Sequence, residues 1–372
     1  MVNFTIKKIN YEDITKVVKF LNNNFSLKEK NFFFSEETFK SKIFQNPYQE
    51  GAIVCAESED GQIIGTASLT PKKIYINQRE FIVAEIGDTY SFQAKKYVKK
   101  YGRQKYMLNN KFDNDFQLYA DENFIRKSIF GSLVNYLLNI AKKKKIDTIY
   151  GTANSQSLSS YINRFSFQKI SSNQIIDYWL ITPYVINQKF LITKKINFFL
   201  KNLFFLFYFL YFKKINFNFN LNVQECFSIE NFKKEIDYLW EISKKNYSLK
   251  KDFQYINWRF SSNEYKKFFL FEKKKLVSWM IIKKQEVFDY KKITICDFNF
   301  ICSNKNFYWF FYTVLLKLNY QKYAINFWSN SNNIFFEKRL LYKKKNINLI
   351  INTNDSDLQK ILNFTIGCSD NI

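Results

Sequence analysis

Three consecutive segments in the first half of the chain limit its fold most narrowly. Residues 84–91 read AEIGDTYS, residues 121–147 read DENFIRKSIFGSLVNYLLNIAKKKKID, and residues 149–170 read IYGTANSQSLSSYINRFSFQKI. In order, they predict a strand, a polar turn leading into an apolar helix, a second strand, and a short helix that ends at a further strand. The apolar helix begins at Ser128, because apolar residues three and four apart then form one stripe. We therefore expect helices packed against a sheet.

The size and composition of the chain indicate two domains with substantial cores. Its 372 residues exceed the usual length of one domain. The formal net charge of +24 has two interpretations. Either the surface meets an anionic partner, such as a nucleotide cofactor, nucleic acid or an acidic membrane, or a coding bias has enriched lysine without selection for binding. The run 142–145 is four lysines, which we expect to oppose the negative end of the helix dipole.

The absence of histidine excludes several kinds of chemistry. A chain with no histidine has no Ser-His-Asp or Cys-His catalysis and no histidine-ligated metal. Any general base must be a carboxylate, a tyrosine, the chain terminus or an ordered water. The five cysteines form no CxxC pair, so neither a zinc ribbon nor a redox motif is expected. We expect free thiols in a reducing compartment, with Cys55 in the core.

The residues before the three segments predict an antiparallel start to the sheet. We expect no signal peptide at the start of the chain, and instead a strand followed by a helix that begins at an acidic turn. Residues 51–77 predict two strands joined at Asp60-Gly61, a strong hairpin signal. Residues 79–91 continue as a third long strand. Residues 93–120 have no clear period and are interpreted as an insertion in a loop.

This order of elements resembles the acyl-CoA-binding core of the GNAT acetyltransferase family. In the family, a loop of pattern Q/R-x-x-G-x-G/A holds the pyrophosphate at a helix N-terminus. Residues 125–130 of this chain read IRKSIF, so they lack the first polar residue and the glycines, although Gly131 follows. The resemblance implies an α+β fold with two GNAT-like domains, each a mixed, mostly antiparallel central sheet flanked by helices.

The resemblance also implies the residues of an acyl-transfer site. Tyr161 would protonate the leaving thiolate, and Asp88 or Glu85 would be the base, with Asp88 preferred. Strand alternation puts these two carboxylates on opposite faces unless Gly87 marks a bulge. Asn154 would bind the pantetheine arm of the cofactor or cap its helix. The complete set of implied cofactor-binding residues is Ile86, Thr89, Tyr90, Arg126, Lys127, Ser128, Ile129, Phe130, Gly131, Ser132, Asn154 and Ser157.

The second half repeats the same order of elements. The strand 293–300 and the helix 307–318 resemble their counterparts in the first half, but CSNKNFYWF stands where a cofactor loop would be. The predicted division is a GNAT-like acyl-CoA-binding domain at 1–185, an apolar aromatic linker or helix at 186–222, and a degenerate GNAT-like domain at 223–372. Three interpretations of residues 196–212 stay open: a helix buried between the halves, an interfacial helix lying on a membrane, and a membrane span.

The resemblance implies an N-acyltransferase that moves an acyl group from acetyl-CoA, or another acyl-CoA, to an amine of a small-molecule or sugar-type acceptor. One alternative is an aminoacyl transferase of the peptidoglycan type, which takes aminoacyl-tRNA. The other is a non-catalytic module that binds membranes or RNA through its lysines. We expect no metal, no nucleic-acid partner other than tRNA, and a cytoplasmic location, with peripheral membrane contact through 196–212 if that segment is interfacial. The sequence does not indicate the oligomeric state.

Overall fold

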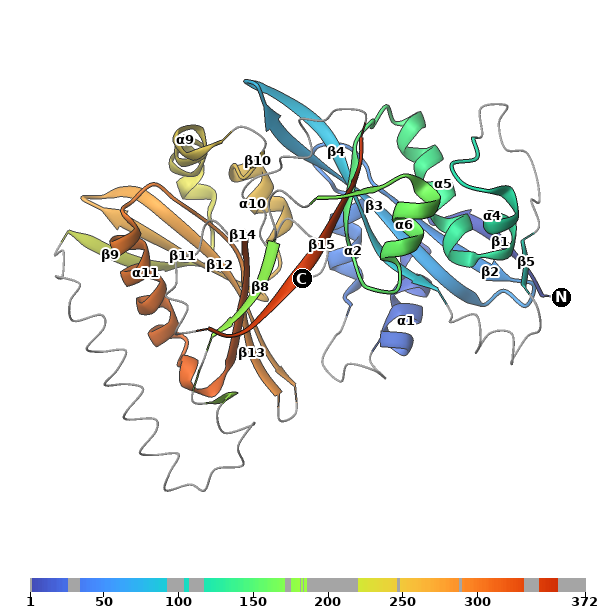
Figure 1. The fold of residues 1–372 in the computed structure, drawn as a ribbon. Coiled ribbons are helices and arrows are strands. Elements are labelled where there is room, and N and C mark those ends of the chain that lie inside the picture. The colour runs from blue at the N-terminus through green and yellow to red at the C-terminus, as the bar shows by residue number, and fades with distance from the viewer. Residues whose placement is uncertain are drawn as a thin grey trace. The chain divides into compact units, whose positions relative to one another are not determined.

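The computed structural model describes residues 2–25, 34–91, 104–106, 117–170, 175–180, 182, 184–185, 220–245, 248–287, 290–330 and 341–353. They form two compact units (Figure 1). The first unit comprises Met1–Ser172, Ile347–Ile361 and Ser369–Asn371, and the second comprises Asn173–Asn346, Leu362–Cys368 and Ile372. The segment 196–212 lies outside the described residues. No helix in the described part of the chain is long and apolar enough to cross a membrane.

The first unit is built on a mixed sheet in which antiparallel pairing dominates. The strand order is β5-β1-β2-β3-β4-β6-β15. Neighbours from β1 to β4 are antiparallel, whereas β6 joins β4 in parallel. The strands are β1 (Val2–Lys8), β2 (Ala52–Ser58), β3 (Ile63–Ile76), β4 (Arg79–Ser91), β5 (Gln104–Tyr106), β6 (Ile149–Ala153), β7 (Gln168–Lys169) and β15 (Leu341–Asn352). The predicted hairpin at Asp60-Gly61 is present between β2 and β3, and Gly61 has the left-handed φ of +77° that a glycine adopts readily.

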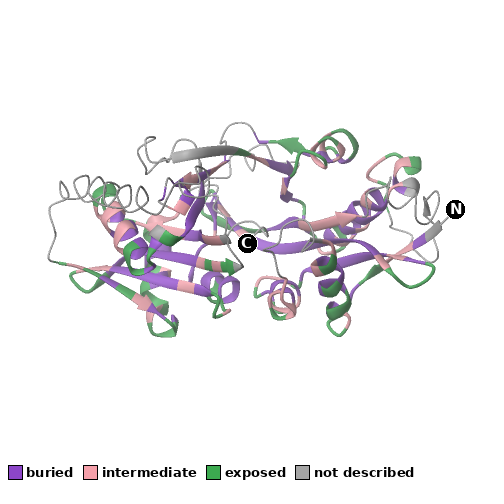
Figure 2. Cartoon of the chain, turned by 90° about the horizontal axis from the view of Figure 1, so that it is seen from below, coloured by how far each residue is buried: buried purple, intermediate pink, exposed green. Residues whose placement is uncertain are grey.

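Helices cover both faces of this sheet, which explains the unbroken apolar run in β2. Val54 belongs to the core under α5, whereas its neighbour Cys55 packs with the residues of α1 and α2. Side chains along a strand alternate between faces, so a strand buried on both sides reads as continuously apolar. Figure 2 shows the strands buried between helices whose outer faces are exposed. The helices are α1 (Ile14–Phe25), α2 (Glu36–Ile43), α4 (Glu122–Lys127), α5 (Ile129–Lys143) and α6 (Leu158–Phe165).

The second unit has a sheet with the same pattern of pairing. Its order is β8-β14-β13-β12-β11-β9, with β13 and β14 parallel and the other neighbours antiparallel. The predicted α+β class is confirmed. The strands are β8 (Ile175–Leu180), β9 (Leu221–Cys226), β11 (Tyr265–Glu272), β12 (Lys275–Val287), β13 (Tyr290–Phe300) and β14 (Ala324–Asn330); the helices are α9 (Lys233–Ser243), α10 (Phe253–Arg259) and α11 (Asn304–Lys317).

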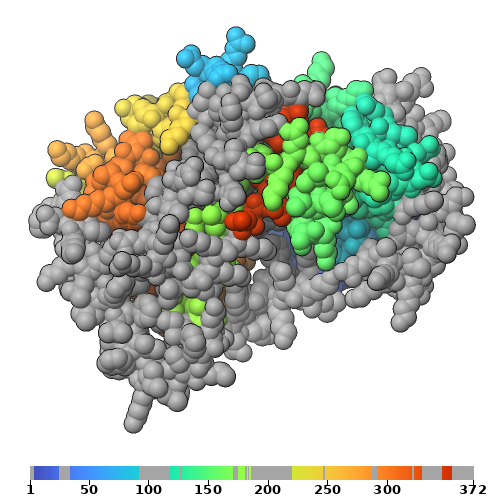
Figure 3. All heavy atoms as spheres, viewed as in Figure 1, coloured from blue at the N-terminus to red at the C-terminus, as the bar shows by residue number. Residues whose placement is uncertain are grey.

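Two strands depart from the order of the sequence. β8 follows the last strand of the first half but pairs with β14 of the second unit, for example Phe327 with Tyr178. Conversely, the end of β15 pairs with β6 and β7 of the first unit, where the Asn352 side chain donates to the Phe165 carbonyl at 2.9 Å. The space-filling view shows β15 (red) beside the green surface of α6 (Figure 3). The predicted division, with boundaries at residues 185 and 223, assigns β8 to the first domain and β15 to the second, and so does not include this exchange of strands.

Candidate active site

A bulge in β4 is the first element of the site. Ser68 of β3 pairs with Gly87, whereas Thr66 pairs with Tyr90, so β4 carries one residue more than β3 over this stretch. Asp88 occupies the bulge with a left-handed φ of +44°. The extra residue shifts the alternation of side chains. The bulge considered at Gly87 is therefore present.

The ladder between β4 and β6 ends next to this bulge. Its pairs are Ala84 with Ile149 and Glu85 with Tyr150, although β4 continues to Ser91 and β6 to Ala153. The Ile86 side chain packs in the core beneath α5. The Tyr90 ring instead lies on Phe20 of α1, with centroids 5.4 Å apart, and its hydroxyl reaches Asn24 at 3.4 Å. Beyond the pairing, β4 can offer backbone groups to an extended ligand.

The predicted phosphate loop is the junction of α4 and α5. Ser128 is the N-cap of α5, and its hydroxyl accepts from the Gly131 N–H at 3.0 Å. The Ser132 N–H donates to the Ser128 carbonyl at 2.9 Å, and the buried Ser132 hydroxyl donates to the Ile125 carbonyl at 2.6 Å. A helix leaves its first N–H groups without intrahelical acceptors. With Gly131 capped, Ile129 and Phe130 supply the remaining N–H groups of the first turn.

The helix α4 was not predicted. Arg126 and Lys127 end this helix directly before the cap, and the positions of their side chains lie outside the description. The Asp121 carboxylate caps its start by accepting from the Phe124 N–H at 3.0 Å. Because α4 ends where α5 begins, the backbone brings the two basic residues to the N-terminus of α5.

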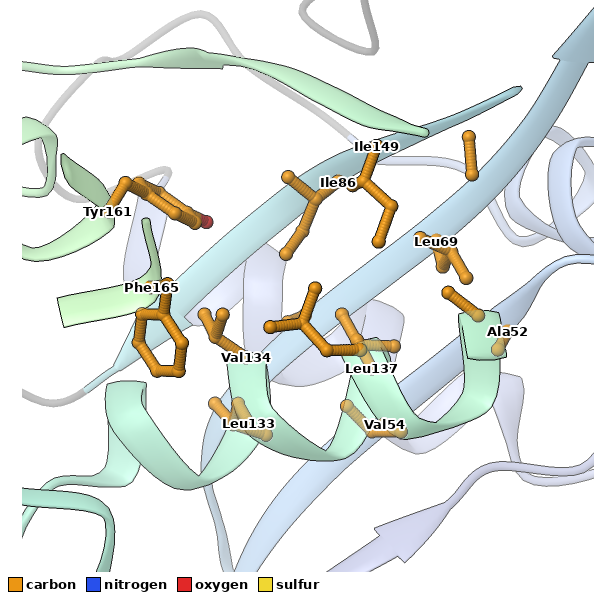
Figure 4. Packing of buried hydrophobic residues seen from close by; sticks show 14 of the residues in the cluster. Ala52, Val54, Leu69, Ile86, Leu133, Val134, Leu137, Ile149, Tyr161 and Phe165 are labelled. Atoms are coloured by element: carbon orange, nitrogen blue, oxygen red, sulfur yellow. The ribbon is translucent and has the colours of Figure 1, made fainter. Parts of the chain in front are cut away.

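Tyr161 of α6 joins the bulge to the start of α5. Its hydroxyl shares a hydrogen bond with the Thr89 hydroxyl at 3.2 Å, and its ring packs edge-on against Phe130 at 5.1 Å and Phe167 at 5.1 Å. Figure 4 shows the Tyr161 oxygen directed toward the strand that carries Ile86. Burial raises the pKa of Tyr161 to about 12, and the Thr89 hydrogen bond acts in the opposite direction. The hydroxyl is thus a proton-bearing group at neutral pH.

Asn154 and Ser157 shape the start of α6. The Asn154 side-chain oxygen accepts from the N–H groups of Gln156 at 3.0 Å and Ser157 at 2.9 Å, and from the Ser157 hydroxyl at 3.1 Å. These contacts organise the turn that leads into α6, whose N-cap residue Ser157 makes no side-chain cap hydrogen bond, and the pantetheine-binding role of Asn154 stays a prediction. Both residues therefore act on the orientation of the helix that carries Tyr161.

The two candidate bases are buried and paired with lysines. Glu85 forms an ion pair with Lys72, and both side chains are almost completely inaccessible. The Asp88 carboxylate pairs with Lys42 of α2 and accepts from the Ser68 hydroxyl at 2.6 Å. Sequence reasoning missed both lysines, because each is distant in sequence from its partner and nothing in its local pattern distinguishes it from a surface lysine. The role of base for Asp88 or Glu85 stays a prediction.

The second unit differs from the first at the positions that correspond to Thr89 and Ser91. The motif Ile-Gly-Asp of β4 has its counterpart in Ile-Cys-Asp of β13, so Phe298 and Phe300 take these places. Both rings pack on Phe307 in the first turn of α11, with Phe300 stacked at 4.3 Å and Phe298 at 5.5 Å. In the first unit, these two positions of β4 carry small polar side chains. In the second unit, the corresponding positions of β13 carry bulky aromatic rings.

The remaining reactive groups do not assemble into another centre in the described part of the chain. No cluster of three acidic or cysteine ligands occurs there. Cys55, Cys226 and Cys296 are buried free thiols, and Cys302 is half-buried. Burial raises the pKa of Cys55 and of Cys296 to about 12, so these thiols are poor nucleophiles.

Solved structures with the same fold include acyltransferases. No protein-family model matches the sequence, and no curated protein matches it. The N-myristoyltransferase of Saccharomyces cerevisiae with bound myristoyl-CoA has a TM-score of 0.60 at 9% identity, over 98% of this chain and 84% of its own. A probable N-acyltransferase from Enterococcus faecalis V583 gives 0.55 at 9% identity, over 94% and 72%. A GCN5-related N-acetyltransferase from Anabaena variabilis gives 0.52 at 11%, again over 94% and 72%. At such low identity, the likeness shows a shared fold.

Proposed function

We propose, from the premise that the chain has the GNAT fold, that its first unit is an acyltransferase using acyl-CoA. The fold itself confirms what the three segments of the sequence predicted. The proposed reaction moves the acyl group, acetyl in the simplest case, to an amine of a small-molecule or sugar-type acceptor. The neighbours support the donor class, since one of them was solved with myristoyl-CoA bound.

One observation carries the proposal: the three predicted segments converge on one place. Tyr161 contacts Thr89 in the bulge through its hydroxyl and Phe130 at the start of α5 through its ring. Three features therefore lie within a few side-chain contacts of each other. They are the part of β4 beyond its pairing with β6, the capped N-terminus of α5 and the buried Tyr161 hydroxyl. Acyl transfer from a thioester uses each of these: backbone donors for an extended arm, N–H groups for a pyrophosphate, and an acid for the leaving group.

The residues present fit this cofactor. The first turn of α5 presents the N–H groups of Ile129 and Phe130 beside two basic residues, a combination suited to a diphosphate. Acyl-CoA would supply the activated acyl group as a thioester. Tyr161 would hold a proton close to the bulge and donate a hydrogen bond as negative charge develops on the leaving sulfur. Its raised pKa means that it remains protonated throughout the physiological range.

Calorimetry with coenzyme A tests the proposal. Replacement of both Arg126 and Lys127 by alanine should weaken binding about a hundredfold or more, because each charge-assisted hydrogen bond contributes about 1.5–3 kcal/mol. The matched control is Lys142→Ala with Lys143→Ala, which removes the same charge from the other end of α5. If both double variants lose affinity equally, the attraction is general electrostatics and the phosphate site is not at residues 126–132.

Two other outcomes would select the alternatives. Salt-dependent binding of tRNA, with no binding of coenzyme A, would favour the aminoacyl-tRNA-dependent transferase. Binding of neither ligand would favour the non-catalytic module. Turnover of acetyl-CoA with a panel of primary amines would then identify the acceptor class.

A further inference from the structure

A buried lysine–aspartate ion pair is present among the described residues of each unit. In the first unit Lys42 pairs with Asp88, and in the second Lys251 pairs with Asp297; each lysine precedes its aspartate by 46 residues. Each lysine opens the same short motif, Lys-x-Phe-Gln, at 42–45 and 251–254. Each aspartate follows an Ile-x dipeptide in the fourth antiparallel strand of its unit. The repeat is therefore one of sequence and of contact.

Both aspartates lie at a bulge. In β13, Ile281 pairs with Asp297 and Ile282 with Ile295, so Cys296 is the extra residue. In β4 the extra residue comes slightly later, between Gly87, which pairs with Ser68, and Tyr90, so Asp88 lies within its bulge whereas Asp297 directly follows the extra residue of its own. Lys42 lies in the last turn of α2, whereas Lys251 comes just before the N-cap of α10, and each reaches the strand near the place where its regular pairing is interrupted.

The contacts of Asp88 fix an unusual backbone conformation. A left-handed φ is unfavourable for residues other than glycine and persists where surrounding contacts enforce it. Lys42 and Ser68 hold the Asp88 carboxylate, while the Thr66 hydroxyl donates to the Asp88 carbonyl at 3.0 Å. The next residue is Thr89, which meets the Tyr161 hydroxyl. The orientation of Thr89 thus depends on the conformation of Asp88.

The second unit keeps the pair without the polar neighbour. Lys251 lies 2.7 Å from the Asp297 carboxylate, which also accepts from the Tyr255 hydroxyl at 3.1 Å, and both charges are almost fully buried. Asp297 does not have a positive φ. Its successor is Phe298, which packs into apolar surroundings. In the second unit, the ion pair therefore lies beside a bulge whose next residue is an aromatic ring.

We propose that Lys42 is a positioning residue that, through Asp88, holds the β4 bulge so that Thr89 and the neighbouring backbone face Tyr161. On this proposal the Asp88 carboxylate anchors the strand and does not take the proton of the acceptor. The effect on ligand binding rests on the proposed acyl-CoA function. The effect on the bulge is independent of that function.

Hydrogen exchange of the full chain, read by mass spectrometry, tests the anchor, with Lys42→Met and its matched control Lys251→Met. Lys42→Met should speed exchange of the amides at 87–91 by about tenfold or more and leave 295–300 unchanged. Lys251→Met should do the reverse. Coenzyme A affinity should fall only in Lys42→Met, by about tenfold or more, since misplaced binding groups are costly. Lys251→Met is the matched control because, like Lys42→Met, it removes the lysine of a buried lysine–aspartate pair.

A second variant guards against simple unfolding. Lys42→Met combined with Asp88→Asn removes both buried charges, and the amide oxygen can still accept from Ser68. Its melting temperature and its protection at 87–91 should recover relative to Lys42→Met. Unchanged exchange at 87–91 in folded Lys42→Met would overturn the anchor. Faster exchange with unchanged coenzyme A affinity would overturn the positioning role. If the native chain binds no coenzyme A, the proposed function fails, and the exchange data still decide the anchor.

Discussion

Removing the Tyr161 hydroxyl should separate chemistry from binding. We expect Tyr161→Phe to lower turnover on the order of a hundredfold, the usual loss when a general acid is deleted. The dissociation constant of acyl-CoA should stay nearly the same, because the hydroxyl interacts strongly only when charge develops on sulfur. Single-turnover kinetics with acetyl-CoA and an active amine, alongside calorimetry, would measure both quantities.

The structure limits the cost of this change to stability. The lost hydrogen bond is one neutral contact of 3.2 Å, worth about 1 kcal/mol, and the Thr89 hydroxyl keeps its contact with the Gly87 carbonyl at 3.2 Å. The ring packing against Phe130 and Phe167 survives. We therefore expect the melting temperature to fall by only about 2–4 °C. Leu158→Ala, on the same helix and partly buried against the same core, is the control for a packing defect.

The pH dependence gives an independent check on Tyr161. Its pKa in the folded chain is raised to about 12, against about 10 for a free tyrosine. Below pH 10 both states keep the proton, and the contribution is fully present. Between about 10 and 12 the unfolded chain ionises first, so stability falls as the pH rises, and Tyr161→Phe should reduce that fall.

Full turnover of the folded Tyr161→Phe variant would refute the catalytic role of the hydroxyl, whatever the melting temperature.

Three further predictions follow from particular contacts. Calorimetry should find one coenzyme A per chain, because Phe298 and Phe300 fill the second unit's counterpart of the polar strand end; a second equivalent would contradict this. Gly151→Ala should destabilise the fold by about 1–3 kcal/mol in denaturant titrations, since its Cβ would lie 2.8 Å from the Ile86 carbonyl oxygen. In a variant with Cys302→Ser and Cys368→Ser, a thiol reagent should modify the three buried thiols slowly in the native chain and quickly in the denatured chain, and fast labelling of Cys55 in native protein would show that it is not buried.

Local signals predicted the first half well where each element has its own pattern. The stripe from Ser128 gave α5 together with its cap, and Asp60-Gly61 gave the hairpin. The bulge at Gly87 could only be raised as an alternative, because one extra residue is visible only against a partner strand. The helix α4 was missed because its six residues are too few to show a period.

Long-range features were beyond the reach of these signals. The exchange of β8 and β15 between the units depends on which strand edge each meets, and a strand's own alternation does not specify its neighbour. The lysine partners of Glu85 and Asp88 were missed for the same kind of reason. A buried lysine and a surface lysine look alike in sequence, so Lys42 and Lys72 cannot be distinguished from the other basic residues, of which the chain has 57 in total.

Comparison of the two units distinguishes residues that stabilise the fold around the candidate site from residues that would contact a ligand. Each unit has a buried lysine–aspartate ion pair, Lys42–Asp88 in the first and Lys251–Asp297 in the second. Loss of either partner would leave an uncompensated buried charge at a cost of about 3–5 kcal/mol, whether or not a ligand binds. The counterpart of Thr89 is Phe298, an apolar ring that packs on Phe307 and whose burial stabilises the second unit. The residues that differ between otherwise equivalent strands are therefore the ones to test for binding, and the residues that agree are the ones to test for folding.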